Sequence, residues 1–73
     1  MTDVVIKAYK NGRYSVEVEA VSTVYGVHYE TRLLMDYADD SGRAHVLKTY
    51  TGDRAHALRA FSRYKLDIER GNI

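Results

Sequence analysis

The stretch "VYGVHYETRLLMDY", Val24 to Tyr37, alternates almost without a break and decides the fold prediction. Its odd positions are mostly apolar or aromatic, whereas its even positions include the polar residues His28, Glu30 and Arg32. Successive side chains of a β-strand point to opposite faces of a sheet. The pattern therefore predicts a long strand over 24–37 with one core-facing side and one polar side.

Turn signals flank this strand and divide the first fifty residues. The Asn-Gly pair in "KNGR", 10–13, is typical of a hairpin, and "ADDSGR", 38–43, gathers the residues that favour a second turn. A weaker break falls at "VST", 21–23. These signals predict a four-stranded antiparallel meander, with strands at approximately 3–10, 13–21, 24–37 and 43–50.

The last third of the chain changes period from two to helical spacing. In "TGDRAHALRAFSRYKLDIERG", 51–71, Asp53 is suited to cap the start of a helix and Gly71 to cap its end. Apolar residues between them recur every three to four positions. We therefore predict a helix over 53–70 that packs on one face of the sheet. The chain, 1–73, is then a single small α+β domain with the order ββββα.

Strand register decides which residues form the core. For the first hairpin, a three-residue loop pairing Lys10 with Tyr14 is preferred over a two-residue turn at Asn11–Gly12, because it gathers the apolar residues on one face. For the last hairpin, either Val46 or Leu47 faces the core. The predicted core consists of Val4, Ile6, Val16, Val18, Val27, Tyr29, Leu33, Met35, Leu47, Leu58, Phe61 and Ile68.

Composition narrows the classes of function. Eleven Lys and Arg against ten Asp and Glu give a net charge of +1, which does not favour nucleic-acid binding as a basic balance would. There is no Cys, so disulfides and Cys-based zinc sites are excluded. No apolar run is long enough for a membrane span or a signal segment. We expect a soluble cytoplasmic protein, and its seven Tyr suit an interface.

The polar row of the opening strand raises the question of catalysis. His28 and Glu30 lie two apart and point the same way, as an acid–base or metal pair requires. A zinc site needs three or four ligands, however, and His45 and His56 are expected on the opposite face. No nucleophile motif or Gly-rich phosphate loop is present. We therefore expect no catalytic, metal or cofactor site.

The face of the sheet without the helix is the first candidate interface. Aromatic residues and Arg dominate interface hot spots, so Tyr9, Arg32, Leu34 and Tyr50, with Glu30 beside them, are the expected contacts of a protein partner. The predicted function is a non-enzymatic protein-binding module. An ordinary solvated face and self-association into a homodimer remain alternatives.

A basic stripe on the helix is the second candidate. Arg54, Arg59 and Arg63 are spaced to follow a phosphate backbone. The alternative is a solvated helix face with the ion pairs Arg63–Asp67 and Lys65–Glu69.

Two resemblances extend these readings. The segment "LKTYTGDRAHALRAFSRYKLDIERG", 47–71, resembles the last strand and helix of AP2-type domains and phage-integrase arm-binding domains, through Tyr50, Thr51, Ala57, Ala60, Phe61 and Gly71. That resemblance implies DNA reading by an exposed sheet face, here at Lys7, Arg13, Arg32 and Lys48.

In size, architecture and Tyr-rich surface, the chain is also similar to small phage-encoded accessory proteins, including anti-CRISPR inhibitors. This second resemblance implies stoichiometric inhibition of a host defence complex that handles nucleic acid.

Overall fold

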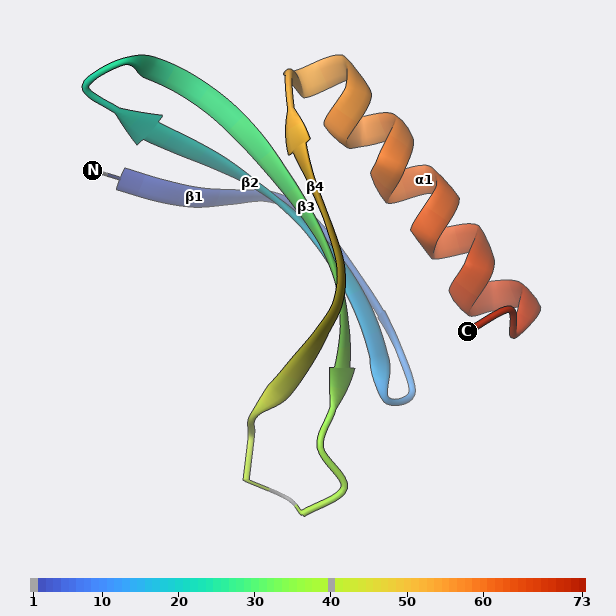
Figure 1. Cartoon of the computed structure of the whole chain (residues 1–73). Helices are drawn as coiled ribbons and strands as arrows, with labels where there is room; N and C mark the ends of the chain where they lie inside the picture. Colours follow the sequence, from blue (N-terminus) through green and yellow to red (C-terminus); the bar gives the residue numbers. More distant parts are fainter. Residues whose placement is uncertain (1, 40) are drawn as a thin grey trace.

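The computed structural model describes residues 2–39 and 41–73 and shows one antiparallel sheet followed by one helix (Figure 1). The elements are β1 (Thr2–Asn11), β2 (Tyr14–Thr23), β3 (Gly26–Asp36), β4 (Ala44–Gly52) and α1 (Arg54–Arg70). The strands lie in the order β1-β2-β3-β4, so each pairs with its neighbour in sequence. The predicted ββββα fold is confirmed. Within the described part of the chain, no helix has the length and apolarity needed to cross a membrane.

Both ends of α1 are fixed by the caps that the sequence indicates. The Asp53 carboxylate accepts a hydrogen bond of 2.9 Å from the backbone N–H of His56. This bond is the main reason why the pKa of Asp53 lies below its ordinary value. At the other end Gly71 adopts a left-handed conformation with φ of 70°, and its N–H donates to the carbonyls of Asp67 and Ile68. A residue with a Cβ would be strained in that conformation.

The core lies between α1 and the two central strands, β2 and β3. Its buried apolar residues are Val16, Val18, Leu33, Ala57, Phe61 and Ile68. Thr31 is also fully buried, and its hydroxyl donates a hydrogen bond of 2.7 Å to the carbonyl of Ala57. Sequence reasoning did not place Thr31 or Ala57 in the core. Together they join β3 to the backbone of α1, where a small residue and a satisfied hydroxyl allow tight packing.

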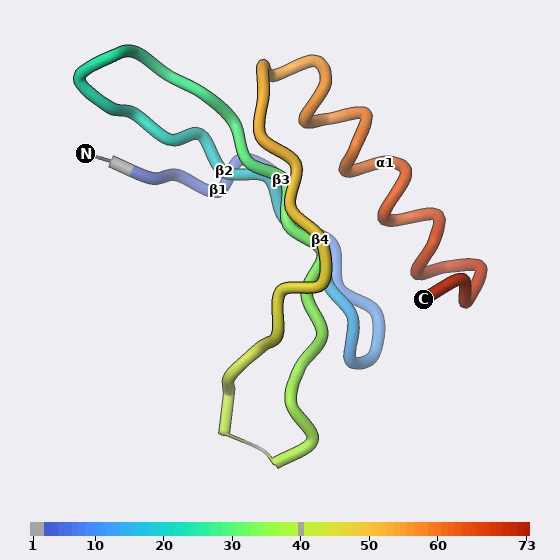
Figure 2. The backbone as a smooth tube through the Cα atoms, viewed as in Figure 1, coloured from blue at the N-terminus to red at the C-terminus, as the bar shows by residue number. Residues whose placement is uncertain are grey.

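Three members of the predicted core are exposed instead. Val4, Ile6 and Val27 retain 53%, 39% and 59% of their accessible surface, so their assignment to the core is wrong. The reason is that α1 does not cover the part of the sheet where they lie. The hairpin between β2 and β3 curves away from α1, and the N-terminal half of β1 runs beside it (Figures 1 and 2). The helix leaves this end of the sheet uncovered.

The register of the first hairpin differs from the expected one beside its turn. Asn11 pairs with Tyr14, and Tyr9 with Val16, so the predicted pairing of Lys10 with Tyr14 is wrong. A bulge between Val5 and Lys7 then shifts the register, and the pairing expected beyond that point is correct. The observed register turns Tyr9 toward the helix, where the ammonium of Lys65 lies 4.9 Å from its ring centroid. An aromatic ring buries more apolar area there than Ala8 would.

A second bulge settles the register of the last hairpin. It lies between the pairs Leu33–Lys48 and Leu34–Val46, so Leu47 is the extra residue on β4. Leu47 packs against the core cluster, whereas Val46 is exposed.

The hydrogen bond of Thr31 provides a test of how helix and sheet are joined. We expect Thr31→Val to lower the free energy of unfolding by about 1 kcal/mol, because it keeps the shape of the side chain and removes the buried donor. Urea denaturation measures this difference. Thr49→Val, on an exposed position of β4, is the matched control and should change stability by less than about 0.5 kcal/mol. Equal effects of the two changes would contradict the role given to this hydrogen bond.

Candidate functional site

The predicted protein-binding residues do not form one surface. Tyr9 pairs with Val16 and Tyr50 with Thr31, so both tyrosines lie on the face that α1 covers. Glu30, Arg32 and Leu34 lie on the opposite face, as expected. The placement of Tyr9 and Tyr50 on that second face is wrong, because each of the two bulges shifts the alternation of a strand by one residue.

Arg32 is the centre of a charge network on the second face. Its guanidinium donates hydrogen bonds to Glu19 and Glu30 and lies 3.5 Å from a carboxylate oxygen of Glu17. Burial alone would lower the pKa of Arg32, but the hydrogen bond to Glu19 and the nearby carboxylates raise it above its ordinary value. Glu19 and Glu30 are direct cross-strand partners, and like charges in such positions repel. Arg32 bridges the two glutamates and is therefore engaged within the sheet.

The polar row of β3 does not assemble a metal centre within the described residues. His28 Nε2 lies 3.4 Å from Glu30 Oε1. No group of three or more His, Cys, Asp or Glu side chains in the parts 2–39 and 41–73 is close enough to hold an ion. His45 pairs with Met35 and lies on the other face of the sheet from His28, as the sequence indicates.

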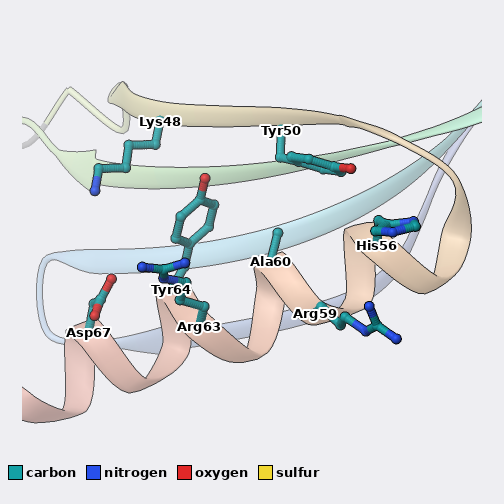
Figure 3. Close-up of a pocket in the computed structure, with 8 residues that line it drawn as sticks. All are labelled: Lys48, Tyr50, His56, Arg59, Ala60, Arg63, Tyr64 and Asp67. Carbon is teal, nitrogen blue, oxygen red and sulfur yellow. The ribbon is translucent and has the colours of Figure 1, made fainter.

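A groove of about 450 Å³ runs between β4 and α1 (Figure 3). We call it the β4–α1 groove. Its lining residues are Lys48, Tyr50, His56, Arg59, Ala60, Arg63, Tyr64 and Asp67. Two of the three helix arginines singled out by the sequence, Arg59 and Arg63, belong to this lining. Arg54 begins the helix and does not.

The cations of the groove differ from Arg32 in that they form no close ion pairs within the part of the chain that the structure describes. Among the described residues, no carboxylate oxygen lies within 4.0 Å of the charged nitrogens of Lys48, Arg59 or Arg63. Neither expected helix ion pair, Arg63–Asp67 or Lys65–Glu69, forms at that distance. Arg32 by contrast contacts three glutamates. The three groove cations therefore form no close ion pair within the described chain, although Asp67 lies in the same lining and Arg59 helps to lower the pKa of Asp53.

Tyrosine side chains shape the same groove. Tyr64 rises from α1 toward the sheet, and Tyr50 lies along β4 (Figure 3). The Tyr50 ring passes so close to Gly52 that a Cβ on that glycine would lie 2.9 Å from ring atoms. Gly52 thus allows the ring to lie flat along the strand. Sequence reasoning missed Lys48 as a member of the groove, because a bulge on β4 has no signal in the alternation. It also missed Tyr64 on α1.

The end of the sheet beyond the helix is a second surface that the sequence did not indicate. Its exposed apolar residues, which we call the protruding end, are Val4, Val5, Ile6, Val24, Tyr25 and Val27. Val24 and Tyr25, at the tip of the β2–β3 hairpin, are 93% and 96% exposed. The turn itself is held by Thr23, whose hydroxyl accepts from the Tyr25 N–H at 3.1 Å, and by Gly26 with φ of 123°.

The Arg32 network supports a prediction about stability. We expect Arg32→Met to lower the free energy of unfolding by about 1–3 kcal/mol, because three carboxylates lose their shared cation. In the Glu19→Gln background the loss should be smaller, since one repelling charge is gone. Denaturant titration of the four proteins of this cycle gives the coupling.

The control for that cycle is Arg43→Met, which breaks an exposed ion pair with Asp39. It should cost less than about 1 kcal/mol. If the two arginine variants lose equal stability, or if Glu19→Gln has no influence, Arg32 does not tie the strands together.

The β4–α1 groove and the protruding end are two surfaces of the described residues that are suited to binding. Comparison of the chain with protein-family models, with curated proteins and with solved structures gives no match.

Proposed function

We propose that this chain is a non-enzymatic protein-binding module and that the protruding end is its contact surface. The observation that carries the proposal is the gathering of large exposed apolar side chains at one end of the sheet. Single exposed apolar residues are normal on protein surfaces, whereas neighbouring ones mark interaction sites. Here they occupy the start of β1, the β2–β3 turn and the start of β3, with Val4 and Val27 on the helix side of the sheet and Val5 on the other side.

The backbone of β1 adds to this surface. β1 is an edge strand, so its outer N–H and C=O groups have no neighbouring strand in the sheet. A partner that adds a strand along β1 pairs those groups and at the same time covers Val4 and Ile6. Complete burial of a side chain such as Val contributes about 1.5–3 kcal/mol. A few such contacts are sufficient for specific binding after the cost of association.

The specific form of the proposal is a stoichiometric inhibitor of a host defence complex that handles nucleic acid. It follows the resemblance in size, architecture and surface to small phage-encoded accessory and anti-CRISPR-type proteins. A hairpin that projects beyond the domain core, as β2 and β3 do in Figure 1, is suited to occupy a site on a larger protein. Binding takes place in the cytoplasm in this proposal, where a chain without cysteine is unaffected by reducing conditions.

Geometry gives less support to DNA reading by the free sheet face, the function implied by the AP2-type resemblance. Lys7 pairs with Val18 on the helix side, and its ammonium lies 4.9 Å from the ring centroid of Phe61. Lys48 also lies on the helix side, and Arg32 is engaged by glutamates. These cations do not share one exposed face.

A pair of substitutions tests the contact surface. We expect Val4→Thr with Val27→Thr to weaken capture of a partner from nuclease-treated bacterial lysate by about tenfold or more, because each added hydroxyl loses its water on burial. Both valines are exposed, so the stability of the variant should change by less than about 0.5 kcal/mol per substitution. Quantitative mass spectrometry of the captured proteins provides the measurement.

The matched control is Val46→Thr, an exposed valine on β4 away from the protruding end. It should retain every protein that the unsubstituted chain retains. Equal retention by the double variant, or capture that occurs only in lysate without nuclease treatment, would exclude this surface as a protein contact. Light scattering of the purified chain should give a monomer. If it gives a dimer that Val4→Thr with Val27→Thr dissociates, the partner at the protruding end is a second copy of this chain.

A further inference from the structure

The cations of the β4–α1 groove come from both of its walls. Arg59 and Arg63 stand one helical turn apart, about 6 Å along the axis of α1. Lys48 lies on β4, which forms the opposite wall (Figure 3). Guanidinium groups bind phosphate oxygens in a bidentate manner. Arg59 and Arg63 make no described ion pair within 4.0 Å, and the lining holds three Lys or Arg residues against one carboxylate, Asp67. The groove therefore favours a ligand with repeated negative charges.

Aromatic rings are interleaved with these cations. Tyr50 on β4 and Tyr64 on α1 both line the groove and are half-buried, so the domain itself fixes their orientation. Proteins that bind single-stranded nucleic acid combine a basic path for the backbone with aromatic side chains on which bases stack. Asp67, at one end of the lining, is a carboxylate that can accept from the amino group of a base. We propose that the β4–α1 groove binds single-stranded nucleic acid.

The size and form of the groove favour a single strand over other anions. A volume of about 450 Å³ is in the range of sites that hold one small molecule, enough for about one nucleotide at a time. A duplex is read by an element that enters its own grooves, whereas here the protein supplies the recess. An acidic peptide would satisfy the cations but offers no planar base for Tyr50 and Tyr64.

The distribution of charge over the molecule directs such a ligand to this side. The net charge is only +1, but Glu17, Glu19 and Glu30 surround Arg32 on the face of the sheet away from the helix. On the helix side, the groove holds Lys48, Arg59 and Arg63 against one carboxylate, Asp67. This segregation gives a nearly neutral protein a local positive field at the groove. The inference is independent of the protein contact proposed for the protruding end.

Fluorescence anisotropy with a labelled oligothymidylate of about a dozen nucleotides tests the inference directly. Arg59→Gln with Arg63→Gln should weaken binding about tenfold or more at a salt concentration of about 50 mM. The matched control, Arg43→Gln with Arg70→Gln, removes the same charge from exposed positions outside the groove and should change binding less than about twofold. Equal losses in the two variants would overturn the groove as the site.

Salt dependence and a tyrosine variant separate the contributions of phosphate and base. Between about 50 and 200 mM salt, the groove variant should show a slope shallower by about 1.4, about 0.7 for each lost phosphate contact. Tyr50→Leu should weaken binding about fivefold or more without changing that slope, because a stacking platform is lost and no charge is removed. An unchanged affinity of Tyr50→Leu would contradict the stacking role.

Competition experiments distinguish the chemical class of the ligand. An unlabelled single strand should displace the probe at lower concentration than a duplex of equal length or poly-glutamate. If poly-glutamate competes equally well, the groove is a site for acidic peptides and the inference is wrong. If the duplex competes equally well, selectivity for single strands is wrong. Val4→Thr with Val27→Thr should bind the probe normally, so failure here and failure of the protein-contact proposal are distinguishable.

Discussion

One helix of seventeen residues has to bury a face of a four-stranded sheet, and the arrangement of this protein depends on that constraint. At about 1.5 Å per residue α1 is about 25 Å long, and it lies across β2 and β3 rather than along the whole sheet. Thr31 and Ala57 join the sheet to the helix through a hydrogen bond, and Phe61 belongs to the same core. Sheet residues under the helix form the core, sheet residues beside it line the β4–α1 groove, and sheet residues beyond it remain exposed.

The elements were predictable because local signals agree with the fold. Alternation over 24–37, the Asn-Gly turn and the caps at Asp53 and Gly71 each indicate the structure that is observed. The faces of the edge strands were not predictable. A bulge adds one residue and reverses the direction of every side chain beyond it, yet it leaves no mark on the hydrophobic pattern.

The candidate site shows the same limit. Arg59 and Arg63 follow from helical spacing alone, whereas Lys48 and Tyr50 reach the groove only because Leu47 is an extra residue in β4. The sequence also does not indicate which sheet residues the helix covers. Val4 and Val27 are apolar, as core residues are, but they lie beyond the helix and are exposed. Net charge also conceals the separation between the Arg32 network and the groove, because opposite charges cancel in a sum but not in space.

In the β2–β3 turn, some residues fix the backbone conformation and others do not. Thr23 supplies a hydroxyl to the turn, and Gly26 takes a conformation that side chains rarely adopt. Val24 and Tyr25, between them, contribute almost nothing to folding, because nearly all of their surface faces solvent. The tip is therefore open to evolutionary change: successive substitutions at two positions can alter what the hairpin recognises, while the domain that carries it stays the same.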